Sequence, residues 1–192
     1  PPAQARTLLG RMSLRRLHLA LDQPEALTLV ESLTGLATVN GLDAAFVRRI
    51  GPDLRQALRG SPAGLRRHAV EAGGRHLLPI PQQMPRREAL ALAEREGAHL
   101  LCLPSVHRVH ATHRALLPIA AEYLTTGWFH CGLELVGACA LRWSDGSPAG
   151  AELGSLIPEL STGRHVPGSC LHQRVSAVSA RDRLMAVLEW TG

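Results

Sequence analysis

The chain has 192 residues, a net charge of +5 and a sequence pI of about 9.8. Its apolar fraction of 45% excludes a disordered protein, and a chain of this length can bury a core without a disulfide or a metal. The sequence contains no apolar run of about 18 residues, the length that a membrane-spanning helix requires.

The front half of the chain carries signals for short helices. Residues 1–12 are predicted to be an N-terminal extension, and residues 13–74 a helical front half. Alanine and leucine favour helices, whereas aromatic residues, which favour strands, make up only 3% of the chain. Successive helices are predicted from turn residues and leucine spacing over 13–21, 22–39, 42–50, 51–60 and 61–74.

The succession of short antiparallel helices over residues 24–72 resembles one or two units of the helical-repeat families. In those families neighbouring units stack to bury a shared core. The resemblance comes from periodicity and turn spacing, and no second copy follows at a fixed period. No family is therefore assigned.

A proline-rich segment separates the front half from the rest. Residues 75–85 contain three prolines and cannot be helical throughout, so they are predicted to be an extended connection. Residues 86–192 form a predicted back half that completes one compact unit. Within it, 86–103 has the strongest helical pattern, and 104–127 is predicted as one helix, or as two that meet at Pro118.

The C-terminal third has a different composition. A strand is possible before the Asp145-Gly146 turn signal, and residues 144–170 are rich in Gly, Ser and Pro and are predicted to be loop. Residues 179–190 are predicted to be a helix, with a strand as the alternative for 184–190. The predicted fold class is mainly α, with a C-terminal third that is irregular or contains a small β element.

Three histidines at spacings of three follow a cysteine, and they are the candidate metal ligands: Cys102, His107, His110 and His113. On a helix adjacent members of the trio lie about 60° apart, so two could bind one ion, but all three would converge only if the helix bends. Cys102 would add a thiolate, which zinc accepts. The alternative is a set of partly exposed histidines on an amphipathic helix.

Other catalytic patterns are weak. Cys131 follows His130, and Cys170 lies two residues before His172, but neither pair has a companion signature for nucleophilic chemistry. The absence of lysine excludes a G-x-x-x-x-G-K-[ST] phosphate loop, and G-x-G-x-x-G does not occur. No cofactor and no small-molecule substrate are predicted, and an enzyme is disfavoured.

All 21 basic residues are arginine, a bias for which genomic base composition is the alternative explanation. Arginine makes bidentate contacts to phosphate and carboxylate. Eight arginines in four pairs are predicted to contact phosphate or an acidic partner: Arg15, Arg16, Arg48, Arg49, Arg66, Arg67, Arg86 and Arg87.

The predicted function is a non-catalytic structural or adaptor subunit of a larger multiprotein assembly. Its arginine-rich surface would contact other proteins of the assembly, RNA phosphate or anionic lipid. Four cysteines without a C-x-x-C pair indicate an intracellular reducing compartment, either the mitochondrial matrix or the bacterial cytoplasm. The alternatives are a small metal-binding enzyme or regulator using Cys102 with the three histidines, and a bacterial secretion-apparatus or regulatory adaptor.

Overall fold

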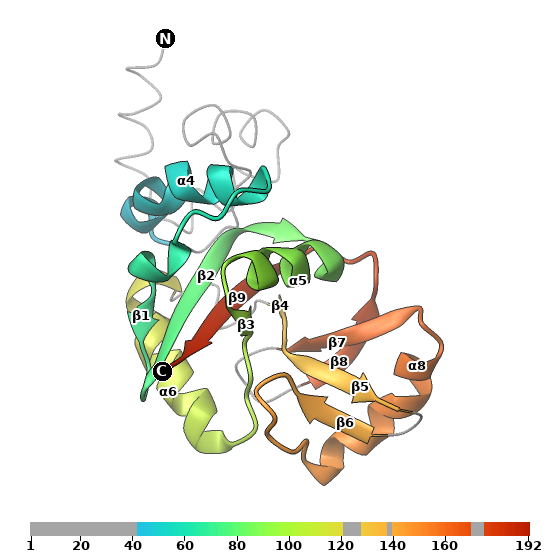
Figure 1. The fold of residues 1–192 in the computed structure, drawn as a ribbon. Helices are drawn as coiled ribbons and strands as arrows, with labels where there is room; N and C mark the ends of the chain where they lie inside the picture. Colours follow the sequence, from blue (N-terminus) through green and yellow to red (C-terminus); the bar gives the residue numbers. More distant parts are fainter. Residues whose placement is uncertain (1–41, 121–127, 138–139, 170–174) are drawn as a thin grey trace, which may run out of the picture.

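The protein has a mixed α/β fold in a computed structural model that describes residues 42–120, 128–137, 140–169 and 175–192 (Figure 1). The larger sheet has the strand order β1-β2-β9-β4-β7-β8, with β3 also paired to β9, and a second sheet contains β5 and β6. The strands are β1 (Val70–Glu71), β2 (Arg75–Met84), β3 (His99–Leu100), β4 (Phe129–His130), β5 (Leu133–Val136), β6 (Ala140–Trp143), β7 (His165–Ser169), β8 (Val175–Ser179) and β9 (Leu184–Thr191).

Helices occupy the remaining regular segments. α5 contacts β3 and β9, whereas α6 contacts β1 and β2. None of the helices in the described residues is long and apolar enough to span a membrane. The helical elements are α4 (Ala44–Leu58), the 3₁₀ turn η1 (Leu65–His68), α5 (Arg86–Arg95), α6 (Val106–Ala120), the 3₁₀ turn η2 (Ala151–Leu156) and α8 (Ile157–Ser161).

The centre of the large sheet is the antiparallel pair β2 and β9. Leu78 lies opposite Leu188 in this pair, and the other edge of β9 takes β4 and β3. Every residue from 185 to 190 is buried. A strand buried on both faces has no alternation of apolar and polar residues, so its sequence reads as an apolar run.

The predicted mainly α fold class is wrong, and the central strands explain why. Residues 184–191 are β9, the strand alternative, because burial on both faces overrides the helical spacing of the leucines. Residues 75–84 are β2 in the core of the sheet. Its prolines are tolerated because β1 pairs with β2 only as far as Leu77, so beyond that point β2 has β9 as its one described partner.

The helix predictions have mixed outcomes. Residues 44–58 form one helix, with Pro52 in its interior, instead of two helices. The predicted helix over 61–74 is wrong, since this segment contains η1 and β1. The helix predicted over 86–103 ends at Arg95 and is followed by β3. The helices predicted before residue 42 lie outside the described residues.

Candidate functional site

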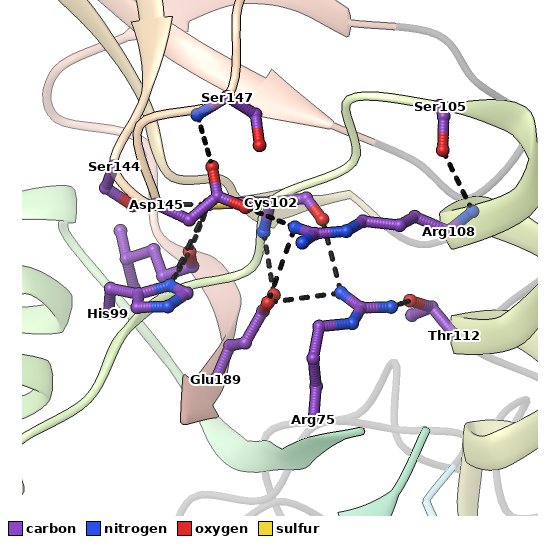
Figure 2. A network of polar contacts seen from close by, with 11 residues as sticks. Arg75, His99, Cys102, Ser105, Arg108, Thr112, Ser144, Asp145, Ser147 and Glu189 are labelled. Atoms are coloured by element: carbon purple, nitrogen blue, oxygen red, sulfur yellow. Dashed lines mark hydrogen bonds and ion pairs between the residues drawn. The ribbon is translucent and has the colours of Figure 1, made fainter. Parts of the chain in front are cut away.

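A network of polar side chains lies inside the protein where β9, β2, α6 and the turn after β6 meet (Figure 2). Its centre is Glu189 of β9, which has no solvent exposure. Arg75 Nη1 of β2 lies 3.1 Å from Glu189 Oε1, and the Cys102 backbone N–H donates to Glu189 Oε2 at 3.0 Å. A buried carboxylate is costly unless it is paired and hydrogen-bonded, and here both oxygens have partners.

Arg108 extends the network from Glu189 to the turn after β6. Its Nη1 lies 3.8 Å from Glu189 Oε1 and pairs with Asp145 Oδ2. Asp145 Oδ1 also accepts the Ser147 backbone N–H at 2.9 Å. Partial burial raises the pKa of Asp145, but the hydrogen bonds from Ser147 and the pairing with Arg108 outweigh it and hold that pKa below its ordinary value. Asp145 is therefore ionised, and its ion pair with Arg108 holds the turn after β6 against the core.

Close backbone packing joins the second sheet to the first beside this network. The Gly132 N–H donates to the Leu101 carbonyl at 2.9 Å, and the Ser144 N–H donates to the Gly132 carbonyl at 2.7 Å. A Cβ on Gly132 would lie 2.5 Å from the Leu100 carbonyl oxygen and 2.9 Å from Cys102 Sγ. Only glycine fits at position 132, where the backbone packs this closely against Leu100. The hydrogen bond from Ser144 to Gly132 places Ser144 at the base of the turn.

One group of metal-type donors occurs within the described residues: His99, Cys102 and Glu189, with ligand atoms within 4.8 Å of one another. The donor types suit zinc, but their present roles oppose it. His99 Nδ1 faces the Leu100 carbonyl at 3.1 Å, so this nitrogen carries the proton. Burial raises the pKa of the Cys102 thiol to about 12, and the guanidinium of Arg75 already balances the charge of Glu189.

The four predicted metal ligands differ in burial. Cys102 is fully buried, while His107 and His110 are exposed and His113 is half-buried on α6. Cys102 groups with His99 and Glu189, and within the described residues the α6 histidines are not part of that group. Metal binding by Cys102 and the three histidines stays a prediction.

The predicted arginine contacts divide into exposed and buried residues. Arg48, Arg49 and Arg87 are exposed. Arg86 is buried, and its guanidinium donates to the carbonyls of Cys131 and Leu133, so it joins α5 to the chain around β5.

The paired arginines of η1 are also exposed, and both already have partners. Arg66 donates to the Gly192 carbonyl at 2.8 Å, and Arg67 pairs with Asp53 at 2.6 Å. Arg15 and Arg16 lie outside the described residues.

His130, the last residue of β4, and Cys131, which follows it, are both part of the protein core. Cys131 is fully buried, and this burial raises the pKa of its thiol, which disfavours the thiolate that a nucleophile needs. His130 is also fully buried, and its Nε2–H donates to the Met84 carbonyl at 2.7 Å. The second sequence candidate, Cys170 with His172, lies outside the described residues.

Sequence reasoning missed most of the network. Arg75, His99, Arg108 and Glu189 were not singled out, and the residues lie far apart in the sequence. Glu189 could have been identified from the sequence, because it is the single acidic residue in the apolar run 184–190. A charged residue inside such a run predicts a buried partner of opposite charge.

A second set of exposed polar residues lies on α8 and at the start of β7, two elements that contact each other. Glu159, Arg164 and His165 are exposed. Their backbone is fixed, since Thr162 Oγ1 accepts the Arg164 N–H at 3.3 Å and the Arg164 carbonyl accepts the Ala180 N–H at 3.0 Å.

No family model matches the chain, and neither does any curated protein. Solved structures of similar shape include the carbohydrate-recognition domain of the mouse scavenger receptor C-type lectin, with TM-score 0.48 and 13% identity over 65% of this chain and 95% of that chain. C-type lectin CEL-I from Cucumaria echinata has TM-score 0.47 and 14% identity over 63% and 94%. The Kupffer cell C-type lectin receptor Clec4f, a trimeric structure, has TM-score 0.46 and 16% identity over 78% and 97%.

These findings correct the sequence-based predictions of function, partners and location. The helical front half on which the adaptor prediction depended is, in its described part, one helix followed by sheet strands. The predictions of an adaptor subunit, of assembly and RNA partners, and of an intracellular reducing compartment are therefore withdrawn. At these identities and TM-scores the similarity concerns the shape of the fold alone.

Proposed function

We propose that the chain is a non-catalytic carbohydrate-recognition domain, with its ligand bound at the exposed polar surface formed by Glu159, Arg164 and His165. The observation that carries the proposal is the contrast in how polar groups are used. In the network of Figure 2, Arg75 is paired with Glu189, and Arg108 is paired with Asp145, inside the protein. By contrast, Arg164 and His165 at the start of β7 are exposed, and hydrogen bonds hold the backbone that carries them.

A fixed backbone lowers the cost of ordering side chains when a ligand binds. His165 lies opposite Ser179 in the β7–β8 pair, and the backbone of Arg164 is hydrogen-bonded on both sides. A guanidinium and an imidazole donate hydrogen bonds, and the carboxylate of Glu159 accepts them. Such a set complements the hydroxyl groups of a sugar.

The composition of this surface favours a hydroxyl-rich ligand over a protein. Protein interfaces are anchored by large apolar and aromatic side chains. The three residues of the surface are polar or charged, whereas the large exposed apolar residues in the described part of the chain lie on α5, α6 and β5: Leu90, Val106, Leu117, Leu135 and Val136.

A glycan array followed by titration calorimetry tests the proposal. We expect the wild-type chain to bind a defined subset of glycans, and Arg164→Ala/His165→Ala to weaken that binding by at least about tenfold, since each lost hydrogen bond to a charged donor contributes roughly 1.5–3 kcal/mol. Arg87→Ala, at an exposed position on α5, is the matched control and should bind as the wild type does. The proposal is wrong if no glycan binds, or if the double variant binds the same glycans with unchanged affinity.

A further inference from the structure

The side of α4 that faces away from the core carries three arginines in a stripe, of which Arg48 and Arg59 are exposed and Arg55 is half-buried. At 100° per residue, Arg48, Arg55 and Arg59 fall within about 40° of one another on the helix surface. The buried residues of α4, which include Ile50, Leu54 and Ala57, project on the opposite side. The stripe from Arg48 to Arg59 is about 16 Å long.

The stretch of sequence that contains this stripe has an excess of positive charge. Residues 42–71 contain six arginines and three carboxylates. Two of the carboxylates have roles within the fold: Asp43 caps α4 through the Phe46 N–H at 2.8 Å, and Asp53 pairs with Arg67 and His68. In the described residues no carboxylate pairs with Arg48 or Arg59, whose positions are exposed.

The shape of the stripe selects an extended anion. Its length exceeds that of one sulfate or phosphate group, so several anionic groups in a row would be needed to neutralise it. Arginine forks bind such oxyanions in a bidentate manner. A chain molecule with regularly spaced anionic groups fits this arrangement.

The chemistry around the stripe disfavours two other polyanionic partners, single-stranded nucleic acid and an anionic membrane. Single-stranded nucleic acid gains affinity by stacking bases on aromatic side chains, but the one Phe, Tyr or Trp within 42–71 is Phe46, which is buried with the Arg49 guanidinium over its ring at 5.6 Å. A membrane-surface helix must bury its apolar face in lipid. The apolar face of α4 is already part of the hydrophobic core.

We infer that this arginine stripe is a second binding surface, for a sulfated polysaccharide chain. It lies on a different element from the surface at the start of β7, and it goes beyond the proposed function without depending on it.

Binding to heparin in the full chain tests the inference, with fully desulfated heparin as the control ligand. We expect Arg48→Glu/Arg59→Glu to weaken heparin binding by at least about tenfold at roughly 0.15 M salt and to make the salt dependence shallower. Arg87→Glu/Arg114→Glu changes the net charge by the same amount at exposed positions on α5 and α6. This control should weaken binding by less than about threefold.

Three outcomes would overturn the inference. The first is equal weakening by the two charge-reversal variants, which would show a response to net charge alone. The second is tighter binding of single-stranded RNA than of heparin, with the same loss in Arg48→Glu/Arg59→Glu. The third is the absence of heparin binding by the wild type. Arg164→Ala/His165→Ala should retain heparin binding, so failure of the proposed function and failure of this inference are separable.

Discussion

The centre of the large sheet and the start of β7 use polar side chains in opposite ways. At the centre, Glu189 and Arg75 have side-chain exposures of 0% and 6% and are paired with each other. At the start of β7, Arg164 and His165 are exposed, and the contacts that fix this stretch are made by the backbone.

This difference indicates which polar groups are needed for folding and which are available for binding. A buried charge without a partner costs several kcal/mol, so the central network must form whenever the chain folds. Exposed charges on a surface contribute little to stability and keep their capacity for a ligand. Substitutions in the first region should therefore lower the free energy of unfolding, whereas substitutions in the second should alter binding alone.

The largest expected effect is that of Glu189→Ala. It leaves Arg75 buried without its carboxylate, and it removes the acceptor for the Cys102 N–H. We expect the free energy of unfolding to fall by about 3–5 kcal/mol, measured by urea denaturation.

A second variant keeps this prediction testable if Glu189→Ala does not fold. Arg75→Met/Glu189→Leu removes both charges and should be more stable than the single variant, because no unpaired charge is left in the interior. A loss below about 1 kcal/mol for Glu189→Ala, or a double variant less stable than the single one, would contradict the account of the network.

Gly132→Ala should have the next largest effect, because it acts where the second sheet joins the first. The added Cβ would lie 2.5 Å from the Leu100 carbonyl oxygen, and backbone cannot move aside as a flexible side chain can. We expect a loss of about 1–3 kcal/mol in the free energy of unfolding. Gly154→Ala is the matched control, since a Cβ there meets nothing within 4 Å, and it should stay within about 0.5 kcal/mol of the wild type.

The sequence predicted local features of the fold better than its overall class. Helical spacing correctly indicates most of α4, α5 and α6, because each of these helices has one apolar face. It fails for β9, since a strand that is apolar on both faces carries no period of two. The strands β1, β3 and β4 have two residues each, too few for any periodic signal.

The candidate site was still less accessible from sequence. Arg75, Arg108 and Glu189 lie up to 114 positions apart and meet only because β2 pairs with β9 and α6 packs beside them. Motif spacing detects residues that are close in the sequence, as with the three histidines of α6. The Asp145-Gly146 turn was predictable from the Asp-Gly pair, because glycine readily adopts a positive φ, and Gly146 has φ 86°. The ion pair between Asp145 and Arg108 was not predictable.

A smaller effect, visible only as a change with pH, is expected from His130. Burial lowers the pKa of this histidine below its ordinary value of 6.5, and the positive charge of Arg86 acts in the same direction. The unfolded chain therefore binds the proton more readily, so the contribution of neutral His130 is complete above pH 6.5 and is lost as the pH falls below that value.

The variant that tests this is His130→Gln, whose amide can still donate to the Met84 carbonyl. At pH 8 we expect its free energy of unfolding to lie within about 1 kcal/mol of the wild type. Between about pH 6.5 and 5 the wild type should lose more stability than the variant. Asp53 and Asp145 do not interfere in this window, because their pKa values lie below 3.8 and their contributions are lost only at lower pH. Parallel pH profiles for the two proteins would count against this role of His130.

The smallest effect on stability is expected from Arg164→Ala and His165→Ala, and this is what makes them informative. Both residues are exposed, and Arg164 is held through hydrogen bonds of its backbone, which alanine retains. The free energy of unfolding should change by less than about 0.5 kcal/mol. A larger loss in urea denaturation would mean that these side chains hold β7 in place, and the contrast with the central network would then disappear. An unchanged unfolding curve together with weakened glycan binding would instead assign the two residues to recognition, because a folding defect could not produce that combination.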